Sequence, residues 1–219
     1  SQYVRSGGTA LTTEVSAGVQ YILSDGLASS ANIYSGAGQY VSSGGTAGLV
    51  DQKVGGNIFV SVIQGDIVTD VSGVNVSGGF YMSGGVASNF IMYEGGSHVV
   101  SSGGTSIDLK VSSGGSLRVS NGVLRGSNYI FDGGQLLGPT AILENSAGLI
   151  MEVSAGNSSV TSTNLSGDGT LIKIGDGTLT LSSYNNLTGE TQISGGVLQA
   201  GRNSAFGTGG SSHYNVVRG

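Results

Sequence analysis

The phrase Gln2-Tyr3-Val4-Arg5-Ser6-Gly7-Gly8-Thr9-Ala10 is the basic repeat of this chain, because close copies of it recur at nearly constant spacing. Two copies are almost complete: Gln20-Tyr21-Ile22-Leu23-Ser24-Asp25-Gly26-Leu27-Ala28 and Gln39-Tyr40-Val41-Ser42-Ser43-Gly44-Gly45-Thr46-Ala47. Looser copies begin at Phe80, His98 and Leu117. A repeat of about 19 residues is typical of a solenoid, in which each unit buries its apolar side against the next.

A second phrase alternates with the first and consists of a short strand that ends in glycine. Examples are Glu14-Val15-Ser16-Ala17-Gly18, Ile91-Met92-Tyr93-Glu94-Gly95-Gly96 and Leu109-Lys110-Val111-Ser112-Ser113-Gly114-Gly115. Each unit therefore reads strand, glycine turn, strand, glycine turn. Glycine suits these corners because it adopts positive φ and allows close backbone approach.

These strands have three to six residues and are too short to be stable alone, but strands at a fixed period can stack on their copies in the next coil. A helical solenoid is excluded, since no glycine-free stretch keeps a 3.6-residue period for three turns. The residues themselves do not encode the handedness, and the general preference for right-handed crossovers favours a right-handed coil. The sequence predicts an all-β protein, a right-handed parallel β-helix (β-solenoid) with roughly 11 coils of about 19 residues.

The repeat slips in two places, where we expect a bulge or a loop. Residues 57–79 carry about four extra residues, including Gln64-Gly65-Asp66. Residues 135–165 lose the phrase and contain the single proline, Pro139, so the coil type is expected to change there.

The composition fits many short strands and excludes several other classes. Glycine accounts for 42 of 219 residues, proline for 1, and charged residues for 10%, whereas hydrophobic residues reach 37%. The aliphatic content is too regular for a disordered Gly/Ser chain, and collagen needs abundant proline. The net charge of -5 argues against a nucleic-acid partner. The absence of cysteine removes disulfides and thiolate metal sites, and we expect no metal and no cofactor.

From residue 165 the phrasing changes to Gly167-Asp168-Gly169-Thr170-Leu171-Ile172-Lys173-Ile174-Gly175-Asp176-Gly177-Thr178-Leu179-Thr180-Leu181. Further on it reads Leu187-Thr188-Gly189-Glu190-Thr191, Gly195-Gly196-Val197-Leu198 and Ala205-Phe206-Gly207. This segment resembles the autotransporter-associated β-strand repeat. It departs from that pattern at Leu187, where Tyr is usual, and at Phe206, where Leu is usual, and both residues remain apolar.

The upstream Gln-Tyr-Val-Ser-Ser-Gly-Gly-Thr units resemble the AIDA, TibA and antigen 43 group of self-associating autotransporters. The resemblance divides the chain into AIDA-type adhesin repeats (1–134), irregular transition coils (135–164) and the autotransporter-associated β-strand repeat (165–219). The three parts are expected to form one continuous β-helix within a longer passenger.

The resemblance implies a non-enzymatic passenger on the bacterial cell surface, outside the outer membrane. Such passengers mediate self-association in aggregation and biofilm, and adhesion to host cells. The implied partners are the same protein on neighbouring cells, a host-cell surface receptor or glycan, and a heptosyltransferase that modifies Ser or Thr.

One repeat position carries tyrosine and forms the candidate interaction face. The aliphatic residue after each tyrosine must point the opposite way, so aliphatic side chains in the core place tyrosine outside. Exposed tyrosines with glutamine beside them could bury apolar area and form hydrogen bonds. The alternative is stacking that only stabilises the rod. The face comprises Tyr3, Tyr21, Tyr40, Tyr81, Gln2, Gln20 and Gln39.

Serine and threonine recur at the turns, where they are candidates for glycosylation. Their other role is hydrogen bonding within turns and ladders. Ser43 and Ser102 lie inside complete Ser-Ser-Gly-Gly-Thr copies and are the first candidates. The remaining candidates are Ser6, Ser83, Thr46 and Thr105.

No catalytic constellation is present in the sequence. His98 replaces the glutamine of the repeat, and we expect it at an exposed strand position. Asp168 and Asp176 lie in Gly-Asp-Gly turns, which aspartate suits without any catalytic role. The alternative function is a β-helical polysaccharide-active enzyme or tailspike-like hydrolase, which would need clustered carboxylates in a groove.

Overall fold

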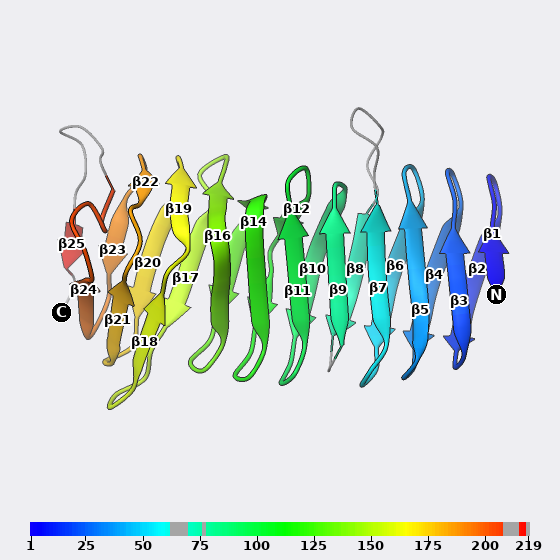
Figure 1. The fold of residues 1–219 in the computed structure, drawn as a ribbon, viewed down its shortest axis with the longest axis horizontal. Helices are drawn as coiled ribbons and strands as arrows, with labels where there is room; N and C mark the ends of the chain where they lie inside the picture. The colour runs from blue at the N-terminus through cyan, green and yellow to red at the C-terminus, as the bar shows by residue number, and fades with distance from the viewer. Residues whose placement is uncertain (62–69, 76–77, 208–214, 218–219) are drawn as a thin grey trace.

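The computed structural model describes residues 1–61, 70–75, 78–207 and 215–217, and all their regular structure is strand (Figure 1). Successive coils stack side by side along the long axis, with the first strand at one end and the last at the other. Every strand pair is parallel, which confirms the predicted parallel β-helix with coils of roughly 19 residues.

The first ladder contains the Gln-Tyr strands, and each strand pairs with the equivalent strand of the next coil. The repeat position is kept in register, because Tyr3 pairs with Tyr21 and Tyr21 with Tyr40. The ladder consists of β1 (Gln2–Val4), β3 (Gly18–Ile22), β5 (Ala37–Ser42), β7 (Asn57–Ser61), β9 (Gly79–Ser83), β11 (Ser97–Ser101), β14 (Ser116–Arg125) and β16 (Gln135–Leu143).

The remaining strands of the large sheet come from the second half of each coil. In the earlier coils they are β2 (Thr9–Val15), β4 (Leu27–Ile33), β6 (Thr46–Gln52), β8 (Asp70–Asn75), β10 (Val86–Met92), β12 (Thr105–Ile107), β13 (Lys110–Val111) and β15 (Ser127–Ile130). Later coils contribute β17 (Gly148–Glu152), β19 (Asn164–Gly167), β20 (Thr170–Ile174), β22 (Asn186–Leu187), β23 (Thr191–Ile193) and β25 (Asn215–Val217).

The first ladder is interrupted after β16. The next strands, β18 (Ser158–Thr161), β21 (Thr178–Leu181) and β24 (Val197–Ala200), form a separate three-stranded parallel sheet near the C-terminal end (Figure 1). Strand β18 therefore has a neighbour on one side only. The domain boundaries expected from the sequence stay a prediction, but this interruption lies within 135–164.

The pairing register of the strands tests both places where the repeat spacing was expected to be irregular. Asn57 pairs with Gly79, whereas Gly38 pairs with Asn57, so one coil is three residues longer than the coil before it. Gln64-Gly65-Asp66 lies outside the described residues. At the second slip, Pro139 falls inside β16 where its register with β14 shifts. Proline cannot donate to a ladder, which explains why the irregularity occurs there.

The core is a set of inward rows that run from coil to coil. Ile22, Ile33 and Leu117 are fully buried, as alternation along a strand requires. The row that begins with glutamine in β1 continues inward as Phe80, His98 and Leu117.

His98 is buried, so the expected exposed position is wrong. Its ring centroid lies 4.2 Å from that of Phe80, and its Nε2 is 2.8 Å from Ser106 Oγ. The repeat position of His98 was identified correctly, but that position faces the core.

The turns at the corners of successive coils also contact one another, as the strands do. Asp25 N–H donates to the Gly44 carbonyl in the next coil at 3.0 Å. Gly44 has a φ of 75°, and a Cβ there would lie 2.9 Å from Ser24 Oγ. A side chain at Gly44 would meet both backbone strain and the preceding turn, which accounts for glycine at this corner.

Candidate interaction surface

Tyr3, Tyr21 and Tyr40 of the first ladder form an outward stacked column, in which Tyr21 is half-buried between two exposed neighbours. Tyr3 and Tyr21 lie with ring centroids 4.9 Å apart and planes 9° apart, and Tyr21 and Tyr40 stack at 5.5 Å. Tyr3, Tyr40 and Tyr81 are 57%, 37% and 44% exposed. The expected outward direction of the column is therefore correct for these residues, whereas its role in interaction stays a prediction.

The glutamines expected beside the tyrosines on that face point into the protein. Gln20 and Gln39 are 0% exposed, and only Gln2, in the first strand, is exposed. Gln20 Nε2 donates to Gln2 Oε1 at 2.7 Å, and Gln39 Nε2 donates to Gln20 Oε1 at 2.7 Å. Gln20 and Gln39 must be removed from the candidate face. Adjacent residues of a strand point to opposite sides, and the chain places tyrosine outside and glutamine inside.

The candidate glycosylation residues lie at or beside the turns that follow the tyrosine strands. Ser6, Ser83 and Ser102 are exposed, and Ser43, Thr46 and Thr105 are half-buried. Ser6 Oγ lies 3.4 Å from Asp25 Oδ2 in the next coil, a weak contact. The hydroxyls of the three exposed serines are accessible to a modifying enzyme.

A polar row also crosses the coils along the second half of each coil, at β2 and β4. Tyr34 OH donates to Glu14 Oε2 at 2.8 Å, and Asn32 Nδ2 donates to Glu14 Oε1 at 3.1 Å. These hydrogen bonds lower the pKa of the Glu14 carboxyl, and the bond to Glu14 raises the pKa of Tyr34. Sequence reasoning missed this row, because its members lie 18 and 20 residues apart and belong to no single motif.

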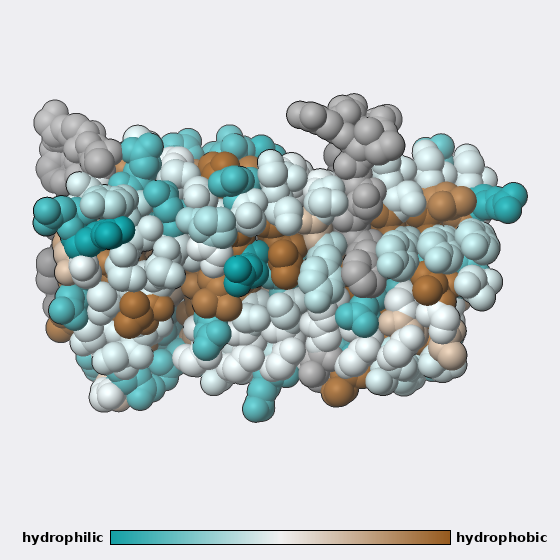
Figure 2. Space-filling model, in the orientation of Figure 1, coloured by the Kyte–Doolittle hydropathy of each residue, from teal (hydrophilic) through white to brown (hydrophobic). Residues whose placement is uncertain are grey.

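The face drawn in Figure 2 carries apolar side chains as separate patches among polar and small residues. A continuous apolar surface is absent from this view. Such a surface suits many weak polar and aromatic contacts better than one large apolar interface.

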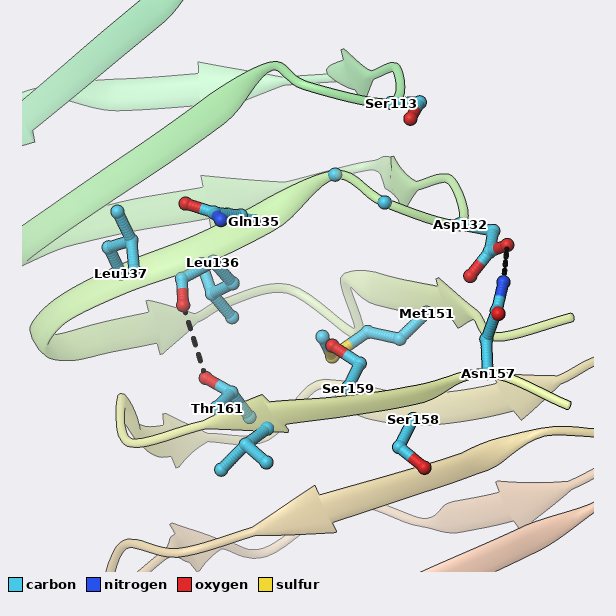
Figure 3. A pocket seen from close by; sticks show the side chains of 13 residues that line it. Ser113, Asp132, Gln135, Leu136, Leu137, Met151, Asn157, Ser158, Ser159 and Thr161 are labelled. Carbon is cyan, nitrogen blue, oxygen red and sulfur yellow. Dashed lines mark hydrogen bonds between the residues drawn. The ribbon is translucent and has the colours of Figure 1, made fainter.

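A groove of about 480 Å³ lies where the first ladder is interrupted, between β16 and β18. Asn157 Nδ2 donates to Asp132 Oδ2 at 2.6 Å at one end, and Thr161 Oγ1 donates to the Leu136 carbonyl at 3.3 Å at the other (Figure 3). Ser159 and the thioether of Met151 lie between these two contacts. The sequence offered one sign of this groove, which is Ser159 and Thr161 at positions that hold Leu179 and Leu181 in the next strand.

Asp132 contributes the only carboxylate among the residues that line this groove. Burial raises the pKa of Asp132, but hydrogen bonds from Asn157, Ser154 and Gly133 outweigh it and hold the pKa below its usual value. Asp168 and Asp176 are exposed and do not line the groove, and Asp168 Oδ1 lies 3.4 Å from Ser146 N. The groove therefore lacks the paired carboxylates that the hydrolase alternative needs.

Lys173, which matches the lysine of the β-strand repeat, is fully buried. Its Nζ donates to the carbonyls of Ile174 at 2.7 Å and Gly175 at 2.5 Å. Burial lowers the pKa of Lys173, and nearby Asp176 opposes that effect. Nζ also donates to the Gly195 carbonyl at 3.3 Å, so the ammonium group joins the corner of its own coil to the corner of the next one.

No group of three or more His, Cys, Asp or Glu side chains suited to a metal ion occurs in the described ranges. Within the same ranges, no helix is long and apolar enough to cross a membrane.

Comparisons with known proteins agree with both sequence resemblances. Residues 72–130 match the family described as the adhesin of the bacterial autotransporter system, probable stalk. Residues 171–200 match the passenger-associated transport repeat. No curated protein matches the chain.

Among solved structures, the chain is similar to the crystal structure of a TibA fragment that was hyper-glycosylated by TibC. The two share 25% sequence identity over 95% of this chain and 87% of that one, with a TM-score of 0.57. The likeness therefore extends along nearly the whole rod.

Proposed function

Because the chain is an autotransporter adhesin passenger of the AIDA and TibA type, we propose that it mediates bacterial self-association and adhesion to host cells from the cell surface. The observation that carries the proposal is the exposed, stacked tyrosine column on successive coils. Each tyrosine offers a ring face and a hydroxyl, which suits contact with another protein surface.

Repetition supplies the binding strength. Weak contacts at successive coils act together once two rods align, so the combined affinity greatly exceeds that of one contact. The partners of this proposal are the same protein on a neighbouring cell, which would support aggregation and biofilm, and a receptor or glycan on a host cell.

We also propose that the exposed turn serines accept heptose from a heptosyltransferase. The accessibility of Ser6, Ser83 and Ser102 supports this, as does the likeness to a TibA fragment that was itself glycosylated by TibC. Ser43, Thr46 and Thr105 are half-buried and would be modified less readily.

Mixed-cell aggregation tests the proposal. Two populations of a non-clumping strain, labelled in different colours, would display the passenger at levels measured with an antibody. We expect mixed clumps and attachment to cultured epithelial cells, with neither in cells that display no passenger. Displayed protein that causes no clumping and no attachment would overturn the proposed function.

A further inference from the structure

The groove between β16 and β18 is a break in an otherwise continuous hydrogen-bond ladder. At the preceding coils Ser116 N–H donates to the Gly96 carbonyl at 2.9 Å, and Gln135 N–H donates to the Gly115 carbonyl at 3.0 Å. The corresponding carbonyl of Gly134 receives no such bond from the next coil within the described part of the chain. The Gly134 carbonyl, directly before β16, is therefore available to a ligand.

The core is also hollowed at this level. Leu179 and Leu181 of β21 are buried to within 1%, but their partners in β18 are Ser159 and Thr161. These side chains fill less space than leucine and present hydroxyls. Met151, 3% exposed, lies at the base of the groove. The result is a concave space with polar sides where a neighbouring coil has a packed apolar layer.

The closed ends limit what can enter. The Asp132–Asn157 and Leu136–Thr161 hydrogen bonds join the two walls at opposite ends of the groove (Figure 3). A peptide strand inserted between β16 and β18 would need about 4.8 Å on each side along its length, which these two contacts prevent. The space of about 480 Å³ instead suits a small molecule.

The chemistry of the walls narrows the class of ligand. The single carboxylate, Asp132, repels an anion. One carboxylate also supplies too few oxygen ligands to bind a cation. The Gln135 amide and the hydroxyls of Ser158 and Ser159 offer both donors and acceptors. Leu137 and Val160, which are 37% and 66% exposed, add apolar contact at the rim. A neutral ligand with many hydroxyls and some C–H surface fits this combination.

We propose that this groove binds one neutral pyranose unit of a cell-surface glycan. This proposal rests on the proposed adhesion to host cells. It adds that the partner is a glycan and that the groove between β16 and β18 is where the glycan binds. Sugar binding by the purified chain is measured without cells, so its failure is distinguishable from a failure of aggregation.

The test is an NMR titration of the purified, isotope-labelled chain. The probes are glucose, galactose, mannose, N-acetylglucosamine and fucose, each up to about 50 mM, a concentration that detects dissociation constants in the millimolar range, or binding free energies of about −4 kcal/mol. We expect at least one to give saturable shifts of the amides of Gly134 and of Ser158–Thr161. Sialic acid, which is anionic, is expected to give none. If none of the five neutral sugars shifts these amides, the proposal is overturned.

A matched pair of variants tests the location. Ser159→Leu places in β18 the residue that β21 has in the same row, so it should fill the groove, preserve the coil and weaken sugar binding at least about tenfold. Thr180→Leu lies on β21 outside the groove and should bind as the parent does. If Ser159→Leu fails to fold, Gln135→Ala gives the same test. Unchanged binding in the folded groove variant would overturn the assignment.

Discussion

Gln39 Nε2 donates to Gln20 Oε1 at 2.7 Å in the interior, where both side chains are fully buried. Gln20 in turn donates to Gln2, so its amide is paired on both sides. Gln39 Oε1 has no partner, because the next residue in this row is Ile58. The Gln20 amide therefore takes part in two side-chain hydrogen bonds of this row, whereas the Gln39 amide takes part in one.

Replacing Gln20 should cost more stability than replacing Gln39. Gln20→Leu removes two hydrogen bonds and leaves buried Gln39 Nε2 unpaired, which is expected to lower the free energy of unfolding by about 1–3 kcal/mol. Gln39→Leu removes one bond and the unpaired Gln39 Oε1 but leaves Gln20 Oε1 unpaired, so the number of buried unpaired atoms is unchanged and its cost should be smaller. Urea unfolding followed by circular dichroism measures both. Equal losses, or a larger loss for Gln39→Leu, would contradict a directional ladder.

Breaking the tyrosine column should reduce self-association without unfolding the rod. Changing Tyr3, Tyr21 and Tyr40 together to Ser removes the stacked rings but no core residue. We expect a clear loss of clumping in the mixed-cell assay at equal display. Replacing Leu11, which is 71% exposed on β2, by Ser is the control and should clump like the parent. Clumping that persists in the triple variant would show that the tyrosines only stabilise the rod.

Buried His98 should make the protein sensitive to acid. Burial lowers the pKa of His98 from 6.5 to about 3, against a smaller raising effect of a backbone hydrogen bond with Phe80. Between these values the unfolded chain binds a proton that the folded chain does not. The contribution of His98 to the free energy of unfolding is therefore complete above pH 6.5 and falls as the pH drops toward 3.

His98→Leu isolates this effect, because leucine occupies the same row in the next coil as Leu117. The stability difference between parent and variant should shift in favour of the variant as the pH is lowered from 7 to 4. Thermal unfolding at a series of pH values measures it. A pH-independent difference would mean that His98 can be protonated without leaving the core.

Leu49 has a positive φ of 52°, and its side chain is 70% exposed and is not part of the core. A left-handed conformation costs an ordinary residue about 1–2 kcal/mol, and asparagine tolerates it better. Asn89 adopts a φ of 53° at the corresponding place in β10. Leu49→Asn should therefore raise the free energy of unfolding by about 1 kcal/mol. Leu11→Asn is the matched control, since Leu11 is equally exposed but lacks positive φ, and it should not stabilise.

Glycosylation should follow serine accessibility at the turns. Co-expression with a heptosyltransferase is expected to raise the intact mass by whole heptose units. Ser102→Ala should remove more of that gain than Ser43→Ala, because Ser102 is exposed and Ser43 half-buried. Ser106→Ala is the control, as Ser106 is fully buried. No mass gain in the parent protein would remove the acceptor proposal.

The coil can be predicted from the amino-acid sequence alone. Copies of Gln2-Tyr3-Val4 in register, glycine at the corners and strict alternation leave parallel stacking as the arrangement that buries every aliphatic row. The same alternation placed the tyrosines outside. The residue before each tyrosine position must then face inward, which buries Gln20, Gln39 and His98. Burial of these polar side chains is favourable only with a partner, which a neighbouring coil supplies to the glutamines and Ser106 of the same coil supplies to His98.

The groove, in contrast, arises from the packing of particular coils. Ser159 and Thr161, where the next strand has Leu179 and Leu181, indicate a less apolar row, but nothing local marks that β18 fails to pair with β16. That break depends on how the coil around Pro139 meets the next one, and on hydrogen bonds between residues 25 apart. A repeat fixes the contacts that recur at its own period, whereas a contact that occurs once is set by the packing of two particular coils.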